Sequence, residues 1–413
     1  MPSVLEETAG RLQLNAASLN DLSAAIVYEG KLRVLVLPGM AADILKQKPL
    51  RVEASNFNVT LPAAVLQQLR DLIPAEQLAG SQIFLEASEV EGEAAQRMLA
   101  SAAQQSGVEL NLAGEFLDFK LYIATADGKK SVIHQFVDQL TLELNTHPET
   151  NRNLLGSYYF LDSGNMEYAG GSWLKGKVAL STEHLGTYAV LEYNKSYDDV
   201  PSGHWVHEAV QELSAKHLIQ GVGLRKFDPN RSVTRSEFTA MLTRLLGLEV
   251  KSSTVFTDVS ADQWYAEVVA QAVEAGIVHG MSETRFAPEA LISRQEMAVM
   301  VMRAYEYVSG KKVESKSVIQ FGDLSTAASW ARESIIAAQV LGLIQGRSDR
   351  NFDPGGSATR AEGQWFCIIC LKSRIKSKSS KPGLWDGSVE PFQSPFGGYR
   401  NLRKPIRMNL SVQ

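Results

Sequence analysis

The chain of 413 residues is poor in the features that mark disulfide scaffolds, membrane proteins and nucleic-acid-binding proteins. It has two cysteines, Cys367 and Cys370, which excludes a framework of several disulfides. No apolar run approaches the roughly 18 residues of a membrane span. The formal net charge of -5 gives no overall basic field, so we expect no nucleic-acid partner. With 45% hydrophobic and 21% charged residues, the composition is that of a globular protein of about two or three domains.

Sequence motifs for catalysis and cofactor binding are also missing. There is no phosphate-binding loop, dinucleotide loop, nucleophile elbow or convincing carboxylate pair for glycoside cleavage. Cys367 and Cys370 have the spacing of a redox motif but lack its strand–helix context, and His204 and His207 lack a third ligand for zinc. We therefore expect no catalytic residue, no metal and no cofactor.

Residues 1–195 have the sequence pattern of β-strands. Short runs of Val, Leu, Ile, Phe and Tyr alternate with turn residues, and their period-two spacing predicts strands. The predicted strands are Lys31–Leu37, Leu50–Ala54, Gln82–Glu86, Phe119–Ala124 and Leu140–Leu144, followed by a meander over Tyr158–Tyr193. Two segments, Ala63–Leu72 and Glu93–Gln105, have helical composition, and Asp127-Gly128 predicts a tight turn. We expect a β-rich domain, in which no binding site is recognisable.

From residue 196 the chain repeats itself three times. Each copy has an aromatic-x-Asp motif, a Trp, a Gly 16 residues after the Trp, a Phe-x-Pro motif and a Thr/Ser-Arg-x-Glu motif whose Arg follows the Trp by 30 residues. The repeated residues are Asp199, Asp258 and Asp323; Trp205, Trp264 and Trp330; Gly221, Gly280 and Gly346; and Arg235, Arg294 and Arg360. This constant spacing indicates three copies of one structural unit, expected at 196–250, 255–310 and 320–370.

Each copy predicts two helices joined by a loop. The first is expected to run from the Trp to about the Gly, which would cap it in the left-handed conformation. The second begins at Thr234, Ser293 or Thr359, because Ser or Thr followed three residues later by Glu is a capping box. The apolar stripe of this helix is expected in the core: Phe238, Met241, Leu242, Leu245 and Leu246 in the first copy, and Met297, Met300, Val301, Ala304 and Tyr305 in the second.

The Arg of the Thr/Ser-Arg-x-Glu motif is the strongest candidate for a binding residue. A cation in the first turn of a helix lies at the positive end of the helix dipole, which costs ~0.3–1 kcal/mol, so capping does not account for it. Together with free backbone N–H groups, Arg235, Arg294 and Arg360 would form a site for a carboxylate or phosphate. The alternative is an intramolecular ion pair with an acid such as the Asp of the aromatic-x-Asp motif.

The other repeated residues have both a structural and a binding interpretation. The Trp side chains can pack the first helix against the core or present a flat face to a sugar ring. The Asp can form a turn or accept hydrogen bonds from sugar hydroxyls, and the Gly can be required by the backbone conformation.

Taken together, these motifs resemble three tandem S-layer homology domains over about residues 196–370. The resemblance implies an all-α, pseudo-threefold bundle, so the expected fold class is α+β with a β-rich N-terminal domain. It also implies that grooves between the copies hold cell-wall polysaccharide, typically a secondary polymer with a pyruvylated N-acetylmannosamine end. The Arg, Trp, Asp and Gly residues given above would bind it, and the arginines would hold the carboxylate.

The resemblance implies a non-catalytic protein at the surface of a Gram-positive, spore-forming bacterium. Two alternatives are the anchoring tail of a polysaccharide hydrolase with an upstream catalytic domain, and a lattice protein that self-assembles. The first residues, Met1 to Glu7, lack the layout of a signal peptide, so we expect a fragment or a mis-assigned start.

The third copy departs from the pattern at its end. Copies one and two have Arg244 and Arg303 nine residues after the motif Arg, where copy three has Ile369. The chain is apolar on all sides over 363–371, and residues 371–413 form a basic tail expected to be disordered. The break resembles a shifted reading frame, which would leave the third copy incomplete and put the role of Arg360 in question.

Overall fold

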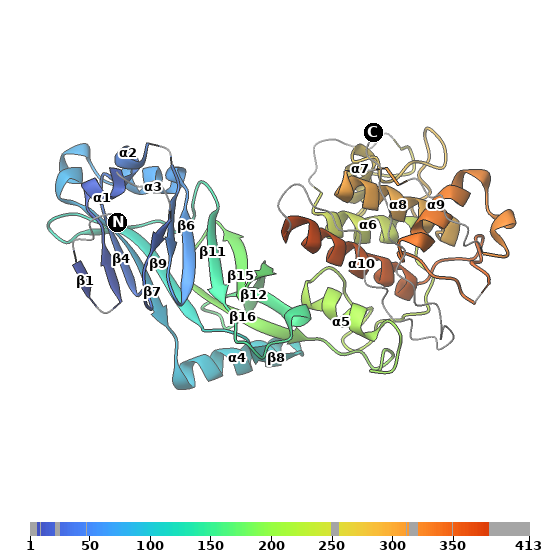
Figure 1. Cartoon of the computed structure of the whole chain (residues 1–413), viewed down its shortest axis with the longest axis horizontal. Coiled ribbons are helices and arrows are strands. Elements are labelled where there is room, and N and C mark those ends of the chain that lie inside the picture. The colour runs from blue at the N-terminus through green and yellow to red at the C-terminus, as the bar shows by residue number, and fades with distance from the viewer. Residues whose placement is uncertain are drawn as a thin grey trace, which may run out of the picture.

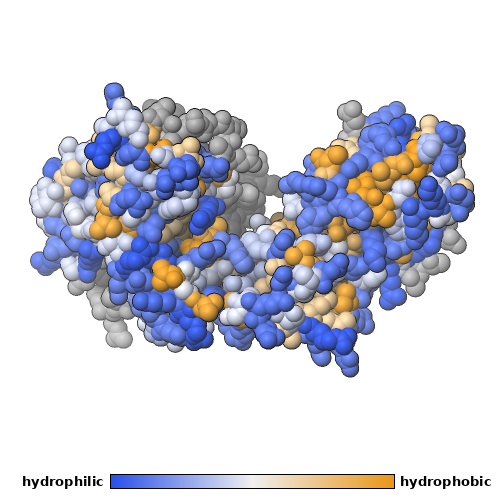
Figure 2. All heavy atoms as spheres, turned by 180° about the vertical axis from the view of Figure 1, so that it is seen from behind, coloured by the Kyte–Doolittle hydropathy of each residue, from blue (hydrophilic) through white to orange (hydrophobic). Residues whose placement is uncertain are grey.

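The computed structural model describes residues 6–8, 10–20, 25–46, 48–248, 256–310, 312–313, 321–348 and 350–379. A β-rich half is followed by a half in which helices and loops alternate (Figure 1). Seen from behind, the two halves form two lobes with mostly polar surfaces and scattered apolar patches (Figure 2). Within the described ranges, every helix is too short or too polar to cross the apolar core of a membrane.

The described residues of the β-rich half form two sheets. The larger has the order β1-β2-β4-β7-β9-β16-β12-β13, with β10 paired to β9 and β8 to β16, and the smaller has the order β14-β15-β11-β6-β5-β3. Pairing is antiparallel except between β2 and β4 and between β3 and β5. The larger sheet comprises β1 (Glu6–Thr8), β2 (Arg11–Gln13), β4 (Val34–Pro38), β7 (Gln82–Glu89), β8 (Glu109–Leu112), β9 (Leu117–Ala124), β10 (Lys130–Val132), β12 (Leu155–Phe160), β13 (Met166–Gly170) and β16 (Thr187–Asn194). The smaller comprises β3 (Ile26–Val27), β5 (Leu50–Glu53), β6 (Phe57–Leu61), β11 (Leu140–Asn145), β14 (Ser172–Leu174) and β15 (Lys177–Thr182).

The main core of this half lies between the two sheets. Alternation along β11 buries Leu140, Leu142 and Leu144, while Phe57 of β6 and Phe119 of β9 meet edge to face with ring centroids 5.0 Å apart. A second, smaller core joins β12 and β16 to helix α4 (Gly92–Ser106). The remaining helical turns of this half are α1 (Ala16–Asn20), α2 (Ala41–Leu45), α3 (Ala63–Arg70), η1 (Ala75–Gly80) and η2 (Arg152–Leu154).

The predicted strands and the two predicted helices of this half are confirmed, but the meander is wrong. Strands β12 and β13 form one hairpin and β14 and β15 another, yet the two hairpins belong to different sheets, and β16 returns to pair with β12. The chain changes sheets at Gly170 and Gly171, whose φ values are 82° and 117°. A Cβ at Gly171 would lie 2.4 Å from Val178 Cγ1, so this crossing requires glycine.

The C-terminal half contains two main helices in each copy. The first helices are α5 (His207–Ala215), α7 (Ala266–Glu274) and α9 (Ser329–Val340); the second are α6 (Arg235–Leu246), α8 (Arg294–Ser309) and α10 (Arg360–Ser379), and η3 (Leu324–Thr326) precedes α9. Helix α6 packs on α7, α8 on α9, and α10 on α5. Contacts therefore run from each copy to the next and from the third back to the first. The region is only partly helical, because long loops carrying the Phe-x-Pro motifs separate the helices.

The capping boxes and the apolar stripes of the second helices are as predicted. Thr234 and Ser293 cap α6 and α8 through reciprocal hydrogen bonds with the Glu three residues later. All ten predicted core residues are at most 8% exposed. They belong to one core shared by the three copies.

The predicted ends of the first helices are wrong. These helices end before the repeated Gly, and the left-handed residues that follow them are His217, Gly276 and Gly342. The repeated glycines serve another purpose, because a Cβ at each would lie less than 3 Å from a backbone oxygen and from the ring of the aromatic-x-Asp motif. The shortest such approaches are 2.6 Å at Gly221, 2.3 Å at Gly280 and 2.6 Å at Gly346.

The third copy has its second helix in place. Helix α10 packs against α5, α6 and α8, and Phe366, Cys367 and Ile368 are buried in the shared core. The helix extends to Ser379, beyond the boundary predicted at 370, and the rest of the predicted tail, residues 380–413, lies outside the described residues.

The two halves meet where α5 packs against β16 and η2. Lys216 donates a hydrogen bond to the carbonyl of Leu155, and Gln211 Nε2 donates one to Asn194 Oδ1 at 2.8 Å. His217 adopts a left-handed φ of 53°, where the other copies have glycine. Its ring stacks on Tyr168 at 4.4 Å and lies 3.1 Å from the hydroxyl of Tyr158 through Nε2. We infer that these contacts offset the cost of the strained backbone, which is about 1–2 kcal/mol.

Substitution His217→Gly tests this docking. The variant relieves the backbone strain but removes the ring contacts, so we expect the two lobes to lose their fixed relation, measured as a broadened distance distribution in small-angle X-ray scattering. The matched control is Gly276→His. It introduces the same backbone strain after α7, away from β16 and η2, and should only lower the free energy of unfolding by about 1–2 kcal/mol. An unchanged scattering profile for His217→Gly would contradict the inference.

The docking should also weaken in acid. The ring keeps a solvent-exposed side, yet desolvation by its surroundings lowers the pKa of His217 to about 4 from an ordinary 6.5. As the pH falls from about 6.5 to 4, the undocked imidazole binds a proton that the docked one does not, and docking is lost progressively. Scattering across this range should show the lobes separating, and His217→Gln should remove the part of the pH dependence between pH 4 and 6.5.

Candidate functional site

The Asp of each copy holds the Phe-x-Pro turn. Asp258 Oδ1 accepts a hydrogen bond from the Phe286 N–H and Oδ2 one from the Ala287 N–H, both at 2.8 Å. Ala287 has a φ of 59°, which an alanine rarely adopts without such support. Burial raises the pKa of Asp258, but the backbone hydrogen bonds outweigh it and leave this pKa below its usual value. Asp199 and Asp323 make the same pairs of hydrogen bonds, to the N–H groups of Phe227 and Asp228 and of Phe352 and Asp353.

The Arg of each copy is buried against the turn of the next copy. Arg235 is 5% exposed, and its Nε and Nη2 donate to the carbonyls of Phe286 and His279, each at 3.0 Å. Its Nη1 pairs with Glu296 at 2.9 Å. The guanidinium also lies over the Phe286 ring, 5.0 Å from its centre. All three guanidinium nitrogens are therefore engaged.

Arg294 makes the same set of contacts, and Arg360 makes the contacts with the two carbonyls. Arg294, which is 2% exposed, donates to the carbonyls of Phe352 and Gln345 at 2.7 and 2.6 Å and pairs with Glu362 at 2.5 Å. Arg360 closes the sequence of contacts from the third copy to the first by donating to the carbonyls of Phe227 and Gln220, each at 2.9 Å.

These contacts correct two expectations for the arginines. The backbone N–H groups at the start of the second helices are not free, because those of Arg235 and Ser236 donate to the carbonyls of Ala290 and Pro288. The ion-pair partner of Arg235 is Glu296, and that of Arg294 is Glu362, rather than an Asp of the aromatic-x-Asp motif. The Glu residues come from the capping boxes of the next copy, so one carboxylate both caps a helix and pairs with an arginine.

The three Trp side chains lie in different surroundings. Trp264 and Trp330 are 57% and 56% exposed, whereas Trp205 is half-buried and contacts the ring of Trp365 at 6.0 Å. The simple packing interpretation therefore fits Trp205 better than the other two.

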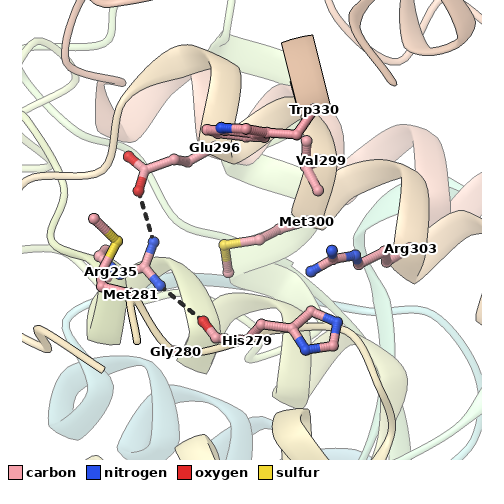
Figure 3. A pocket seen from close by; sticks show the side chains of 9 residues that line it. All are labelled: Arg235, His279, Gly280, Met281, Glu296, Val299, Met300, Arg303 and Trp330. Atoms are coloured by element: carbon pink, nitrogen blue, oxygen red, sulfur yellow. Dashed lines mark hydrogen bonds and ion pairs between the residues drawn. The ribbon is translucent and has the colours of Figure 1, made fainter. Parts of the chain in front are cut away.

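One pocket brings several of the predicted residues together (Figure 3). It has a volume of about 300 Å³ and is lined by Arg235, His279, Gly280, Met281, Glu296, Val299, Met300, Arg303 and Trp330. The indole of Trp330 covers one side, Arg235 and Glu296 lie at one end, and Arg303 and His279 lie at the other. Because its walls come from all three copies, the pocket exists only in the assembled fold.

Sequence reasoning identified Arg235, Gly280 and Trp330 but not the rest of this lining. Burial and the neighbouring Arg303 lower the pKa of His279, which favours the neutral imidazole. Burial also lowers the pKa of Arg303, against an opposing effect of Glu306. The signal for Arg303 was its recurrence nine residues after the motif Arg in two of the three copies.

The cysteine and histidine signals lead to no second site in the described part of the chain. Burial raises the pKa of Cys367 to about 12, which keeps its thiol protonated. His207 Nδ1 contacts the carbonyl of Val200 at 2.8 Å. No three His, Cys, Asp or Glu side chains among the described residues are grouped as metal ligands.

Removing a buried arginine should unfold the repeats more easily. In Arg294→Ala the carboxylate of Glu362 and two carbonyls lose a donor, so we expect a loss of about 3–5 kcal/mol in the free energy of unfolding, measured with urea. The control Arg285→Ala removes an exposed arginine 3.8 Å from Asp258 and should stay within about 0.5 kcal/mol of the parent. Equal effects of the two substitutions would refute the structural role of Arg294.

Comparison with known proteins identifies the repeats. The family model of the S-layer homology domain matches residues 196–239, 255–298 and 320–362. The chain is 34% identical over 223 residues to an amylopullulanase of Thermoanaerobacterium thermosulfurigenes, covering 53% of this chain and 12% of that protein. It is 34% identical over 168 residues to a surface-layer 125 kDa protein of Lysinibacillus sphaericus, covering 40% and 14%. With an S-layer protein of Bacillus licheniformis the identity is 29% over 212 residues, covering 51% and 24%. The chain thus spans less than a quarter of the length of these relatives, and residues 196–362 contain three S-layer homology domains.

Proposed function

We propose that the three S-layer homology domains attach this chain to the bacterial cell wall by binding a wall polysaccharide between the copies. The pocket at Arg235 and Trp330 carries the proposal. An exposed indole face suits the apolar face of a sugar ring, and arginine side chains suit its hydroxyl and carboxylate groups. The domain type and the S-layer relatives support a location at the cell surface.

The proposal includes a closed, pseudo-threefold ring of copies with three related grooves. The buried Arg235, Arg294 and Arg360 form a wall of each groove, and Trp330, Trp205 and Trp264 lie beside them in that order. The Asp and Gly residues of the motifs support the turns that shape these walls. Several weak grooves on one rigid body would bind a polymer with avidity, provided that the polymer presents several binding ends.

We propose an acidic wall polymer, with a pyruvylated N-acetylmannosamine end as the ligand. A ketal-linked pyruvate combines a sugar ring with a carboxylate, which are the two groups that the pocket residues suit. This function is anchoring and assigns no catalytic residue. Self-assembly into a surface lattice is a second candidate, favoured by the relatives that are S-layer proteins.

Co-sedimentation with cell-wall sacculi of a Gram-positive spore former tests the anchoring. We expect the chain to sediment with intact sacculi and to stay in solution after acid removal of the secondary polymer and its pyruvyl groups. Trp330→Ala should weaken binding about two- to tenfold, as expected for the loss of ~0.5–1.5 kcal/mol of aromatic contact. Tyr307, which is 52% exposed on α8 outside the pocket lining, provides the control Tyr307→Ala. No sedimentation of the folded chain with intact sacculi would refute the proposal.

A further inference from the structure

The three grooves have the same buried arginine but different linings. The position of Arg303, nine residues after the motif Arg, is Ile369 in the third copy and Arg244 in the first. The position of Met281, next to the repeated Gly, is Arg347 in the third copy, and that of Val299 is Trp365. The three grooves therefore cannot bind one ligand equally.

Beside Arg294, the residues at the positions of Met281, Val299 and Arg303 contact other side chains of the chain. Arg347 pairs with Asp353 at 2.6 Å and with Glu362 at 3.1 Å. The Trp365 ring lies edge to face with that of Trp205, the residue of the first copy that corresponds to Trp330 in the repeat. Ile369 packs against the shared hydrophobic core. The cation beside Arg294, Arg347, is thus already paired with two carboxylates of the chain.

The first copy has an arginine at the position of Arg303, but this arginine is exposed to solvent. Arg244 is exposed on α6, where solvent and salt screen its interaction with an anion. Glu237, in the wall of the groove beside Arg360, is already paired with Arg231, at 2.7 Å.

The groove beside Arg235 differs from both others because Arg303 is half-buried in its pocket. Throughout the described ranges, no hydrogen bond or ion pair reaches the Arg303 guanidinium. The acid that acts on it electrostatically, Glu306, already accepts a hydrogen bond from the Val313 N–H. Arg235, at the other end of the pocket, has all three nitrogens engaged by the protein. Two arginines thus line one pocket, and the donors of Arg303 are available to a ligand.

We infer that Arg303 is the residue that contacts the acidic group of the proposed ligand, and that the pocket between Arg303, Arg235 and Trp330 is the principal binding groove of the chain. Arg235 is then a positioning residue that holds the wall of the groove. The inference rests on the proposed anchoring function and assigns the binding charge to a residue outside the Thr/Ser-Arg-x-Glu motif.

Geometry and charge together favour this assignment. A guanidinium presents paired N–H donors that match the two oxygens of a carboxylate. Partial burial reduces screening, so the same pair is stronger in the pocket than at the surface position of Arg244. The Trp330 ring on an adjoining wall would contact the sugar ring while its carboxylate reaches Arg303 (Figure 3).

Calorimetric titration of the whole chain with two probes tests the inference. The first is the methyl glycoside of N-acetylmannosamine carrying a 4,6-linked pyruvate ketal, and the second is the methyl ester of that ketal, which lacks the charge. For the parent chain we expect the acid to bind at least about tenfold more tightly than the ester. Arg303→Gln should abolish most of this preference, Arg303→Lys should restore part of it, and the matched Arg244→Gln should leave it unchanged within about threefold.

The outcomes separate the inference from the proposed function. An unchanged acid preference in Arg303→Gln, or an equal loss in Arg244→Gln, would overturn the inference while the sacculi assay could still support anchoring. The inference also fails if Arg303→Gln weakens acid and ester binding equally, since its role would then be structural. A chain that sediments with sacculi but binds neither probe would overturn the ligand class. If the folded chain binds neither sacculi nor probes, both the proposed function and the inference are wrong.

Discussion

A buried arginine at the start of one helix, donating to the backbone of the next copy, is the interaction on which the C-terminal half depends. A charge as buried as Arg294, which is 2% exposed, is tolerable only if its hydrogen-bonding capacity is met. The next copy meets it with two carbonyls and a carboxylate. The carbonyl of Phe352 lies at a turn in which Asp353 has a φ of 61°, and Asp323 holds this turn, so the second copy depends on the third.

This dependence explains why the unit repeats three times. A single copy would leave its arginine without acceptors and the carbonyls of its Phe-x-Pro turn without a donor. When Arg360 reaches back to Phe227 of the first copy, every arginine has its acceptors and every turn has its arginine. Because the helices also share one apolar core, polar and apolar contacts favour the same arrangement.

The features predicted from the sequence are those decided by neighbours along the chain. Capping at Thr234, the apolar stripe from Phe238 and the alternation in β11 depend on local spacing, and all three are confirmed. The predictions that are wrong concern features that depend on contacts with segments distant in the sequence. The repeated Gly is required by a ring that belongs to the aromatic-x-Asp motif, and β16 pairs with β12, with which it shares the smaller core under helix α4.

In the candidate site, too, local spacing predicted some features and contacts between distant segments determine the others. The repeat spacing indicated Arg235 and Trp330 as candidate binding residues. It did not reveal that the Arg235 side chain donates its hydrogen bonds to carbonyls of the neighbouring copy. A repeated residue in a ring of copies is as useful for joining the copies as for binding a ligand, and sequence alone does not separate the two roles. The two roles differ in the structure, because the protein itself provides acceptors for all three guanidinium nitrogens of Arg235.

In the proposed function, the residues that join the copies and the residues that contact the ligand are therefore different. The arginine–carbonyl contacts recur in all three copies, since losing one would open the assembly. The positions of Met281, Val299 and Arg303 differ among the copies because they face the groove and the assembly does not require them to be alike. The ring of Trp365 contacts Trp205 in one place and a half-buried Arg303 lines a pocket in another, while the arginine–carbonyl contacts that join the three copies stay the same.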